Sequence, residues 1–237
     1  MKKVLLILVA ALAASPVLHA QEDGGVRFGL KAAPNMAWLR SDTKGLESDG
    51  SKVGFTFGLV TEFPIGAAGN YRFATGLFLN NVGGKYTTPF TYTDANGATV
   101  TKDLASDVKL RYVELPLTMK LMTKEIGYMR YYGQIGFGAA FNVRAKADFE
   151  TVTVDANGVF TGSSTFEDED VKDSVQPVKG SLIMGAGLEY TFSGSTTLQV
   201  GVNYNNGLTN ILKDEEVEGK TAKLLQDYLE LNIAVFF

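Results

Sequence analysis

Apolar and polar residues alternate along most of the chain. A period of two is typical of β-strands with one apolar face, and eight segments show it. The last segment is an example, because Leu229, Leu231, Ile233, Val235 and Phe237 take every second position. The eight predicted strands are residues 26–39, 52–63, 71–86, 108–122, 131–145, 180–192, 197–208 and 228–237.

The connections between these strands alternate in length. The short ones are residues 64–70, 123–129 and 193–196. The long ones are residues 40–51, 87–107, 150–176 and 209–226. Antiparallel strands would place all the short connections at one end, together with both termini. Short periplasmic turns and long extracellular loops are typical of bacterial outer-membrane barrels. The sequence thus predicts an all-β fold, an eight-stranded antiparallel up-and-down transmembrane β-barrel.

The composition of the second strand face indicates where the apolar face points. A water-exposed barrel surface should be rich in Lys and Glu, but here the alternate positions are small or amide residues, which suit a crowded interior. Examples are Gly136, Gly138, Asn142, Gly185, Gly187, Gln199, Gly201, Asn203 and Asn205. The apolar face covers five or six alternating positions, about what a tilted strand needs to cross the membrane core. We therefore expect it to contact outer-membrane lipid. A soluble lipocalin-like barrel, with its apolar face around a ligand, is the third interpretation.

Aromatic residues gather beside the short connections, as in the interfacial girdle of membrane barrels. They are Phe63, Tyr71, Phe73, Tyr131, Tyr190 and Phe192. The terminal Phe237, preceded by Val235, Ile233 and Leu231 at alternate positions, also resembles the signal read by the barrel-assembly machinery. We expect these four residues to act as an assembly signal. The alternative is that Phe237 only packs.

Residues 1–20 have the pattern of a secretory signal peptide. Lys2 and Lys3 precede an apolar run that is too short to span a bilayer, and Ala20 offers a small residue for cleavage before Gln21. The domain prediction is a signal peptide at 1–20 and an outer-membrane barrel at 21–237. Export to the cell outer membrane follows from this prediction.

The amino-acid composition excludes several kinds of catalytic and binding site. The chain has no cysteine, and its one histidine, His19, would leave with the signal peptide. Without Lys2 and Lys3, twenty Lys and Arg face 26 Asp and Glu, a formal charge of −6, which disfavours nucleic-acid binding. Histidine-dependent triads and histidine metal sites are excluded in the mature chain. We expect no enzyme activity, no cofactor and no metal, and we expect a monomer.

Charged residues also fall on the predicted inner face. They are Arg27, Lys31, Glu62, Arg72, Glu114, Lys120, Arg144, Glu189 and Glu230. Buried charges must pair or face water, and five basic groups nearly balance four acidic ones. We expect a network of side chains that plugs the barrel. A proton or ion path is the alternative.

The long connections hold two Asn-Gly hairpin signals, "TDANGA" at 93–98 and "VDANGV" at 154–159. Both are predicted to rise as ribbons that continue the barrel strands. The acidic run 167–170 lacks the ligand spacing of a calcium loop and is predicted to be a solvated tip. Residues 215–230 suggest a short helix before the last strand.

The segment "LRYVELPLTMK" at 110–120 resembles the "YLEIPLLLK" strand of the PorT-like family of outer-membrane β-barrel proteins. The segments "GLKAAPNMA" (29–37), "GFTFGLVTEFPI" (54–65) and "GAGLEYTF" (185–192) resemble other strands of that family. The resemblance makes Glu114 and Pro116 hallmark positions, and a mid-strand proline implies a bulge. The founding member is tied to type IX secretion, and most relatives have no assigned role.

These patterns predict a non-enzymatic integral outer-membrane β-barrel with a structural or surface-interaction role and an interior plugged by side chains. The alternative is a component of a secretion apparatus of the type IX kind, with a secretion partner. No residue in the sequence names that partner or a surface ligand.

Overall fold

The computed structural model describes residues 25–41, 43, 45–66, 69–192, 196–213, 216–217 and 220–237. The predicted signal peptide, residues 1–20, lies outside the described residues. In the described ranges the elements are β1 (Arg27–Ser41), β2 (Glu47–Ser48), β3 (Ser51–Ile65), β4 (Tyr71–Thr93), β5 (Thr99–Met122), β6 (Met129–Val154), β7 (Phe160–Asp170), the 3-10 turn η1 (Lys172–Ser174), β8 (Val178–Thr191), β9 (Thr197–Gly207), β10 (Glu216–Val217), β11 (Lys220–Thr221) and β12 (Leu224–Phe236). The all-β prediction is confirmed. Within these ranges no helix is both long and apolar enough to cross a membrane.

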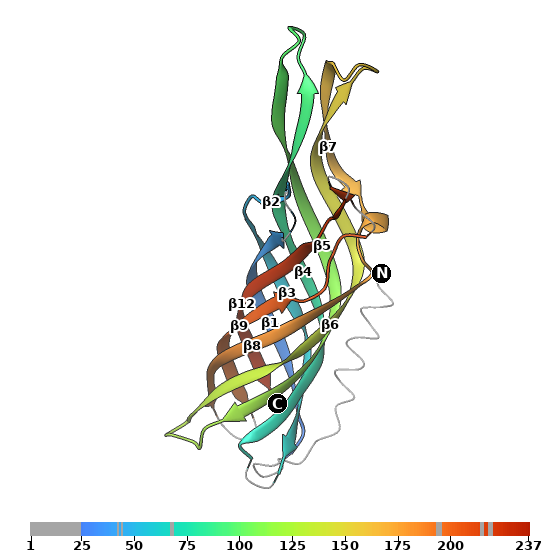
Figure 1. Cartoon of the computed structure of the whole chain (residues 1–237). Helices are drawn as coiled ribbons and strands as arrows, with labels where there is room; N and C mark the ends of the chain where they lie inside the picture. The colour runs from blue at the N-terminus through green and yellow to red at the C-terminus, as the bar shows by residue number, and fades with distance from the viewer. Residues whose placement is uncertain are drawn as a thin grey trace.

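Eight of the described strands form a closed antiparallel circuit (Figure 1). The order of pairing is β1, β3, β4, β5, β6, β8, β9 and β12. β12 then pairs with β1, from Gly29 opposite Phe236 to Ser41 opposite Leu224. Because the first and last strands meet, the sheet closes on itself and all eight strands have neighbours on both sides.

Two hairpin ribbons rise above the closed sheet (Figure 1). β4 and β5 stay paired as far as Thr93 opposite Thr99, and β6 and β7 as far as Val154 opposite Phe160. Gly97 and Gly158 occupy the turns with φ of 83° and 77°, a conformation that glycine adopts without steric cost. The prediction of two ribbons with Asn-Gly tips is therefore confirmed.

Two local predictions are wrong. The register runs unbroken past Pro116, from Thr75 opposite Leu117 to Phe78 opposite Glu114, and the shift lies instead at Arg111 and Tyr112 against β6. The described residues of the segment predicted to hold a helix include β10, β11 and the start of β12. Leu224 and Leu225 are buried there, because β12 pairs with β1 four residues earlier than the sequence predicts.

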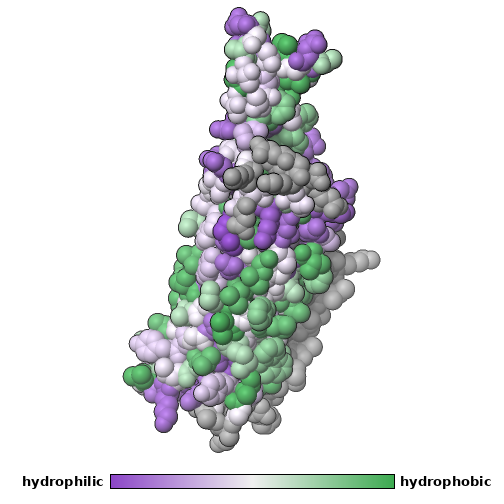
Figure 2. All heavy atoms as spheres, in the orientation of Figure 1, coloured by the Kyte–Doolittle hydropathy of each residue, from purple (hydrophilic) through white to green (hydrophobic). Residues whose placement is uncertain are grey.

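The outer face of the closed sheet carries a hydrophobic zone. Figure 2 shows apolar residues gathered around the lower half of the visible face, with hydrophilic residues directly above them. Leu59 and Leu77 lie opposite each other in this zone and are 60% and 57% exposed. Other large apolar side chains exposed on it are Phe55, Phe57, Phe63, Tyr71, Tyr131, Ile135, Phe137, Phe141, Leu231, Ile233 and Phe237. The apolar strand face therefore points outward, as the sequence predicts.

Candidate functional site

The interior at the short-turn end holds a cluster of buried ions. Lys120, with no exposed side-chain surface, lies 2.8 Å from Glu62 and also contacts Glu189. Arg27 bridges the same two carboxylates, with its Nε donating to Glu62 at 2.9 Å. Its guanidinium also stacks over the ring of Phe236 at 4.3 Å. Removal of one partner would leave a buried charge uncompensated, so this cluster ties β1, β3, β5 and β8 together.

A second ion pair lies further along the interior. Lys31 contacts Glu230, which also accepts a hydrogen bond from the Asn203 amide at 2.8 Å. Gln134 donates to the Asn203 side-chain oxygen at 2.8 Å. Lys31 also lies 4.6 Å from the ring of Phe78. These contacts connect β1, β4, β6, β9 and β12 across the lumen.

Glu114 is held by neutral donors. Asn80 donates to it at 2.8 Å, Asn205 at 3.0 Å and the Tyr228 hydroxyl at 2.8 Å. Glu114 thus joins β4, β5, β9 and β12, and three donors satisfy a carboxylate that is 3% exposed.

Towards the ribbons the interior becomes apolar. Ala37, Leu39, Leu110, Ile211 and Leu224 belong to one buried hydrophobic cluster inside this end of the closed sheet. Lys179 lies at its border, donates to Gln226 at 2.7 Å, and faces the rings of Tyr112 and Tyr228 at 5.1 and 5.3 Å. The polar network is thus covered by an apolar layer on the side of the long connections.

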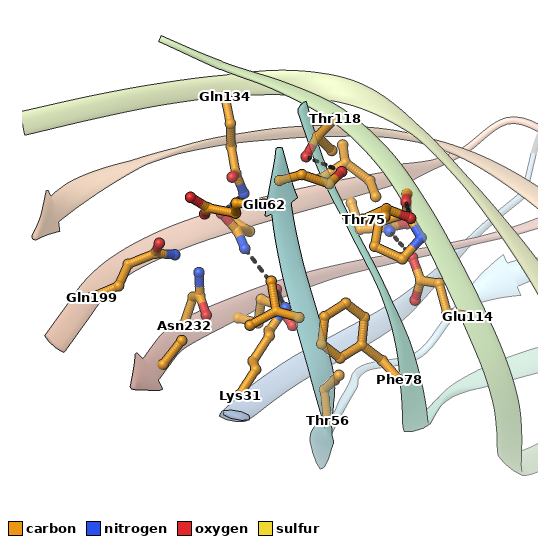
Figure 3. A pocket seen from close by; sticks show the side chains of 18 of the residues that line it. Lys31, Thr56, Glu62, Thr75, Phe78, Glu114, Thr118, Gln134, Gln199 and Asn232 are labelled. Atoms are coloured by element: carbon orange, nitrogen blue, oxygen red, sulfur yellow. Dashed lines mark hydrogen bonds and ion pairs between the residues drawn. The ribbon is translucent and has the colours of Figure 1, made fainter. Parts of the chain in front are cut away.

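A cavity of about 50 Å³ lies within the polar network. Figure 3 shows side chains converging on it from several strands, among them Lys31, Glu62, Glu114, Gln134 and Gln199. A buried water needs about 10–15 Å³, so this volume suits a few waters and no larger solute. Among the described residues no group of three or more acidic or histidine side chains is arranged to hold a metal ion.

The structure places eight of the nine predicted interior charges inside, and Arg144 outside. Arg144 is 51% exposed on the outer face. The register shift pairs Arg111 with Arg144 but Tyr112 with Asn142, so one extra residue in β6 moves the alternation by one position. The predicted interior position of Arg144 is therefore wrong.

Lys179 is the interior cation that the sequence prediction missed. It is 1% exposed and shares the phase of Ser181, Ile183 and Glu189 along β8. The predicted strand begins at Gly180, and extending it by one residue would have placed Lys179 on the inner face. With Lys179 in place of Arg144, the interior again has five basic and four acidic groups.

The tips of the two ribbons touch each other. The Thr93 amide donates to the Gly158 carbonyl at 2.9 Å, and the rings of Tyr92 and Phe160 lie 5.2 Å apart. Below the tips, the Lys102 amine lies 2.9 Å from Glu150. These contacts make the two ribbons one paired projection.

Each tip is closed by an aspartate. Asp94 accepts hydrogen bonds from the backbone amides of Ala98 and Asn96, and Asp155 accepts the equivalent pair from Val159 and Asn157. These amides favour the ionised carboxylate and lower the pKa of both aspartates below the ordinary 3.8.

Because the pKa of both aspartates is lowered, the stability of the ribbon tips should fall at low pH. The contribution of the two aspartates to tip stability is present above pH 3.8 and is lost as the pH falls through their lowered pKa values. Carbon NMR titration of the carboxyl groups should show both midpoints below 3.8. In the Asp94→Ala variant, the rate of hydrogen exchange at backbone amides should rise at that tip and stay unchanged in the barrel. A midpoint at or above the ordinary value would contradict the expectation.

The geometry is that of a closed sheet with an apolar exterior and a polar, filled interior. The family model described as outer membrane protein beta-barrel domain matches residues 19–213. The chain belongs to this family. Outer membrane protein beta-barrel domains reside in the outer membrane, so the closed circuit of strands is an outer-membrane barrel.

Three solved structures similar to this barrel share little sequence with it. Neisserial surface protein A is 17% identical over 90% of this chain and 97% of its own, with a TM-score of 0.45. OprG from Pseudomonas aeruginosa is 9% identical over 92% and 99%, with a TM-score of 0.41. Ail, the attachment invasion locus protein of Yersinia pestis, is 14% identical over 91% and 100%, with a TM-score of 0.36. Comparison with curated protein sequences finds no significant match.

Proposed function

We propose that this outer-membrane barrel is a non-catalytic scaffold that presents its two joined ribbons at the cell surface as an interaction surface. The observation that carries the proposal is the contact between the tips, where Thr93 bonds to Gly158. Two independent flexible loops would need no such contact. A paired projection is preorganised, and a partner that binds it has less conformational entropy to overcome.

The filled interior favours a scaffold over a channel. The Arg27–Glu189 pair joins β1 to β8, and the hydrogen bond from the Tyr228 hydroxyl to Glu114 crosses the lumen from β12 to β5. The apolar cluster covers the end below the ribbons. An eight-stranded barrel is just wide enough for side chains to fill. We propose that the barrel is a closed monomer that does not conduct ions.

The proposed orientation completes this arrangement. Eight strands cross the membrane with the short turns in the periplasm and the ribbons outside, and outer-membrane lipid covers the exposed apolar zone. Cleavage before Gln21 releases the signal peptide after export. The uneven connection lengths and the apolar zone in Figure 2 support this orientation.

The second candidate is a component of a type IX-like secretion apparatus. It rests on the resemblance of residues 110–120 to the PorT-like family, whose hallmark Glu114 lies at the centre of the interior network. Membership of that narrower family remains our proposal. Neighbouring genes for secretion components would favour this candidate over the surface scaffold.

Surface labelling tests the proposed function. An epitope inserted between Asn96 and Gly97 should be bound by antibody on intact cells, whereas the same epitope at Gly127, in a short turn, should be bound only after permeabilisation. Both insertions lie in turns with glycine at positive φ and should leave the barrel folded. Detection of both epitopes, or only the second, on intact cells would contradict the proposal.

Deletion of Phe237 tests the proposed assembly signal. Phe237 is 64% exposed, and its amide donates to the Phe28 carbonyl at 2.9 Å, so it adds little interior packing. We expect the deletion to lower the amount of folded barrel in cells and to leave refolding of purified protein in detergent nearly unchanged. Phe237→Ser should match the deletion, and Phe237→Trp should retain assembly. Equal impairment in cells and in detergent would make Phe237 a packing residue.

A further inference from the structure

A groove opens on the outer surface where β3 leaves β4. The pairing of β3 with β4 ends at Phe55 opposite Asn81, although β3 continues to Ser51 beside β1. The resulting hollow has a volume of about 260 Å³. We call it the basic groove, defined by Lys52, Lys109, Arg111, Arg144, Lys146 and Asp168.

The groove concentrates positive charge that the surrounding acids only partly balance. Four of its five cations form ion pairs with three carboxylates: Lys52 with Asp107, Lys109 with Asp148 at 2.6 Å, and Lys146 and Arg144 with Asp168. A fourth carboxylate, Asp170, lies opposite Lys146 on β7. Arg111 is held by a neutral group, with its Nε donating to the Asn81 side-chain oxygen at 2.7 Å. This hydrogen bond orients the terminal nitrogens of the Arg111 guanidinium and leaves its positive charge uncompensated.

Asp168 marks the position that an anion takes in this groove. Its carboxylate contacts Lys146 and lies 4.0 Å from both Lys109 and Arg144. The residue sits at a register shift of β7 with φ of 54°, the only positive φ outside glycine among the described residues. Aspartate is one of the few residue types besides glycine that adopts this conformation, and here it aims a 55% exposed carboxylate at three cations.

The apolar zone continues directly below these cations. Arg111 pairs with Arg144, and Val113 pairs with Phe141 two residues further along β5 and, past the bulge, three along β6. That step is about 6.6 Å along a strand. Phe141 is 53% exposed, and Val53 in the groove is 85% exposed. A ligand with an anionic head and an apolar tail would meet cations and hydrophobic surface at the matching spacing.

We propose that the basic groove binds the phosphate-bearing headgroup of a lipid in the leaflet that faces the ribbons. The acyl chains would lie along Phe141 and the apolar zone below it, and Arg111 and Arg144 would hold the phosphate. Arginine suits this role because its planar donors match phosphate oxygens in pairs. The proposal rests on the proposed orientation, which puts the groove at the outer membrane surface.

The experiment uses the full mature protein in phosphatidylcholine nanodiscs. Native mass spectrometry measures retention of diphosphorylated lipid A against the same lipid with both phosphates removed. The test variant is Arg111→Gln with Arg144→Gln. The matched control is Lys124→Gln with Lys172→Gln, which removes the same charge from exposed sites outside the groove. A parallel arm adds inorganic phosphate as a soluble competitor.

We expect wild type and control to retain the phosphorylated lipid preferentially, and the double arginine variant to bind it about tenfold more weakly or worse. Asp168→Asn should bind it about two- to fivefold more tightly, because an exposed competing carboxylate is lost. This variant keeps the proposal testable if the arginine variant does not fold.

Three results would overturn the site: equal retention of both lipids, equal loss in the arginine and control variants, or weaker binding by Asp168→Asn. Displacement of the lipid by inorganic phosphate would assign the groove to free phosphate instead. Failure of the wild-type protein to enter nanodiscs would refute the proposed membrane orientation, and the lipid site with it. A folded, inserted barrel without phosphate preference would refute the lipid site alone.

Discussion

Glu189→Gln is expected to lower the free energy of unfolding by about 3–5 kcal/mol, the usual cost of removing one partner from a buried ion pair. Glu189 contacts both Lys120 and Arg27, and the substitution leaves Glu62 to neutralise both cations. Urea unfolding in detergent, followed by the fluorescence of Trp38, the single tryptophan, measures the change.

A double substitution separates lost charge balance from lost packing. Lys120→Met added to Glu189→Gln should recover most of the loss, because one buried cation disappears with its acid. Glu150→Gln is the surface control, since its partner Lys102 is 41% exposed, and it should cost less than about 1 kcal/mol. If Glu189→Gln and Glu150→Gln had equal effects, the interior cluster would be solvated and the lumen open.

Leu59→Arg is expected to cost about 2–4 kcal/mol, because it places a charge near the middle of the lipid-facing zone. Leu59 is 60% exposed and lies opposite Leu77. In a water-exposed sheet, such a substitution would cost close to nothing. Reversible unfolding in phospholipid vesicles, read from heat-modifiable migration on gels, gives the difference.

Val53→Arg is the matched control on the same strand. Val53 is 85% exposed, in the same phase as Leu59, and lies above the hydrophobic zone beside the basic groove. At that depth the cost should fall to about 0–1 kcal/mol. Equal costs at the two positions would show that depth in a bilayer does not govern this face, and the lipid-facing assignment would fail.

Alternation was sufficient to predict the strands and their faces because a sheet with unlike sides imposes a period of two on every strand. It failed at Arg144, where one extra residue in β6 inverts the phase. A bulge leaves no compositional mark in "FNVRAKA", so the sequence does not reveal it. At Pro116 the sequence predicts a bulge that does not form, since the register is unbroken from Leu115 to Leu117.

The sequence predicts which residues belong to the interior network, but it does not predict which of them pair with each other. Alternation places Glu62, Lys120 and Glu189 on one face, yet only the curvature and closure of the sheet bring β3, β5 and β8 to one point. The sequence does not predict the basic groove, because the groove arises where β3 separates from β4 and where Asp168, at a positive φ, turns towards lysines far from it in the sequence.

The closure of the sheet by β1 and β12 has a consequence for the timing of folding. The contacts from Gly29–Phe236 to Ser41–Leu224 join strands far apart in the sequence, so the loop they close contains all the other strands of the circuit. Such non-local pairing is slow to form. Until β12 arrives, β1 and β9 each present an open edge that another strand can occupy. The interval before closure is therefore the period of greatest vulnerability to aggregation, and a factor that shields β1 or delivers β12 would govern the yield of folded protein.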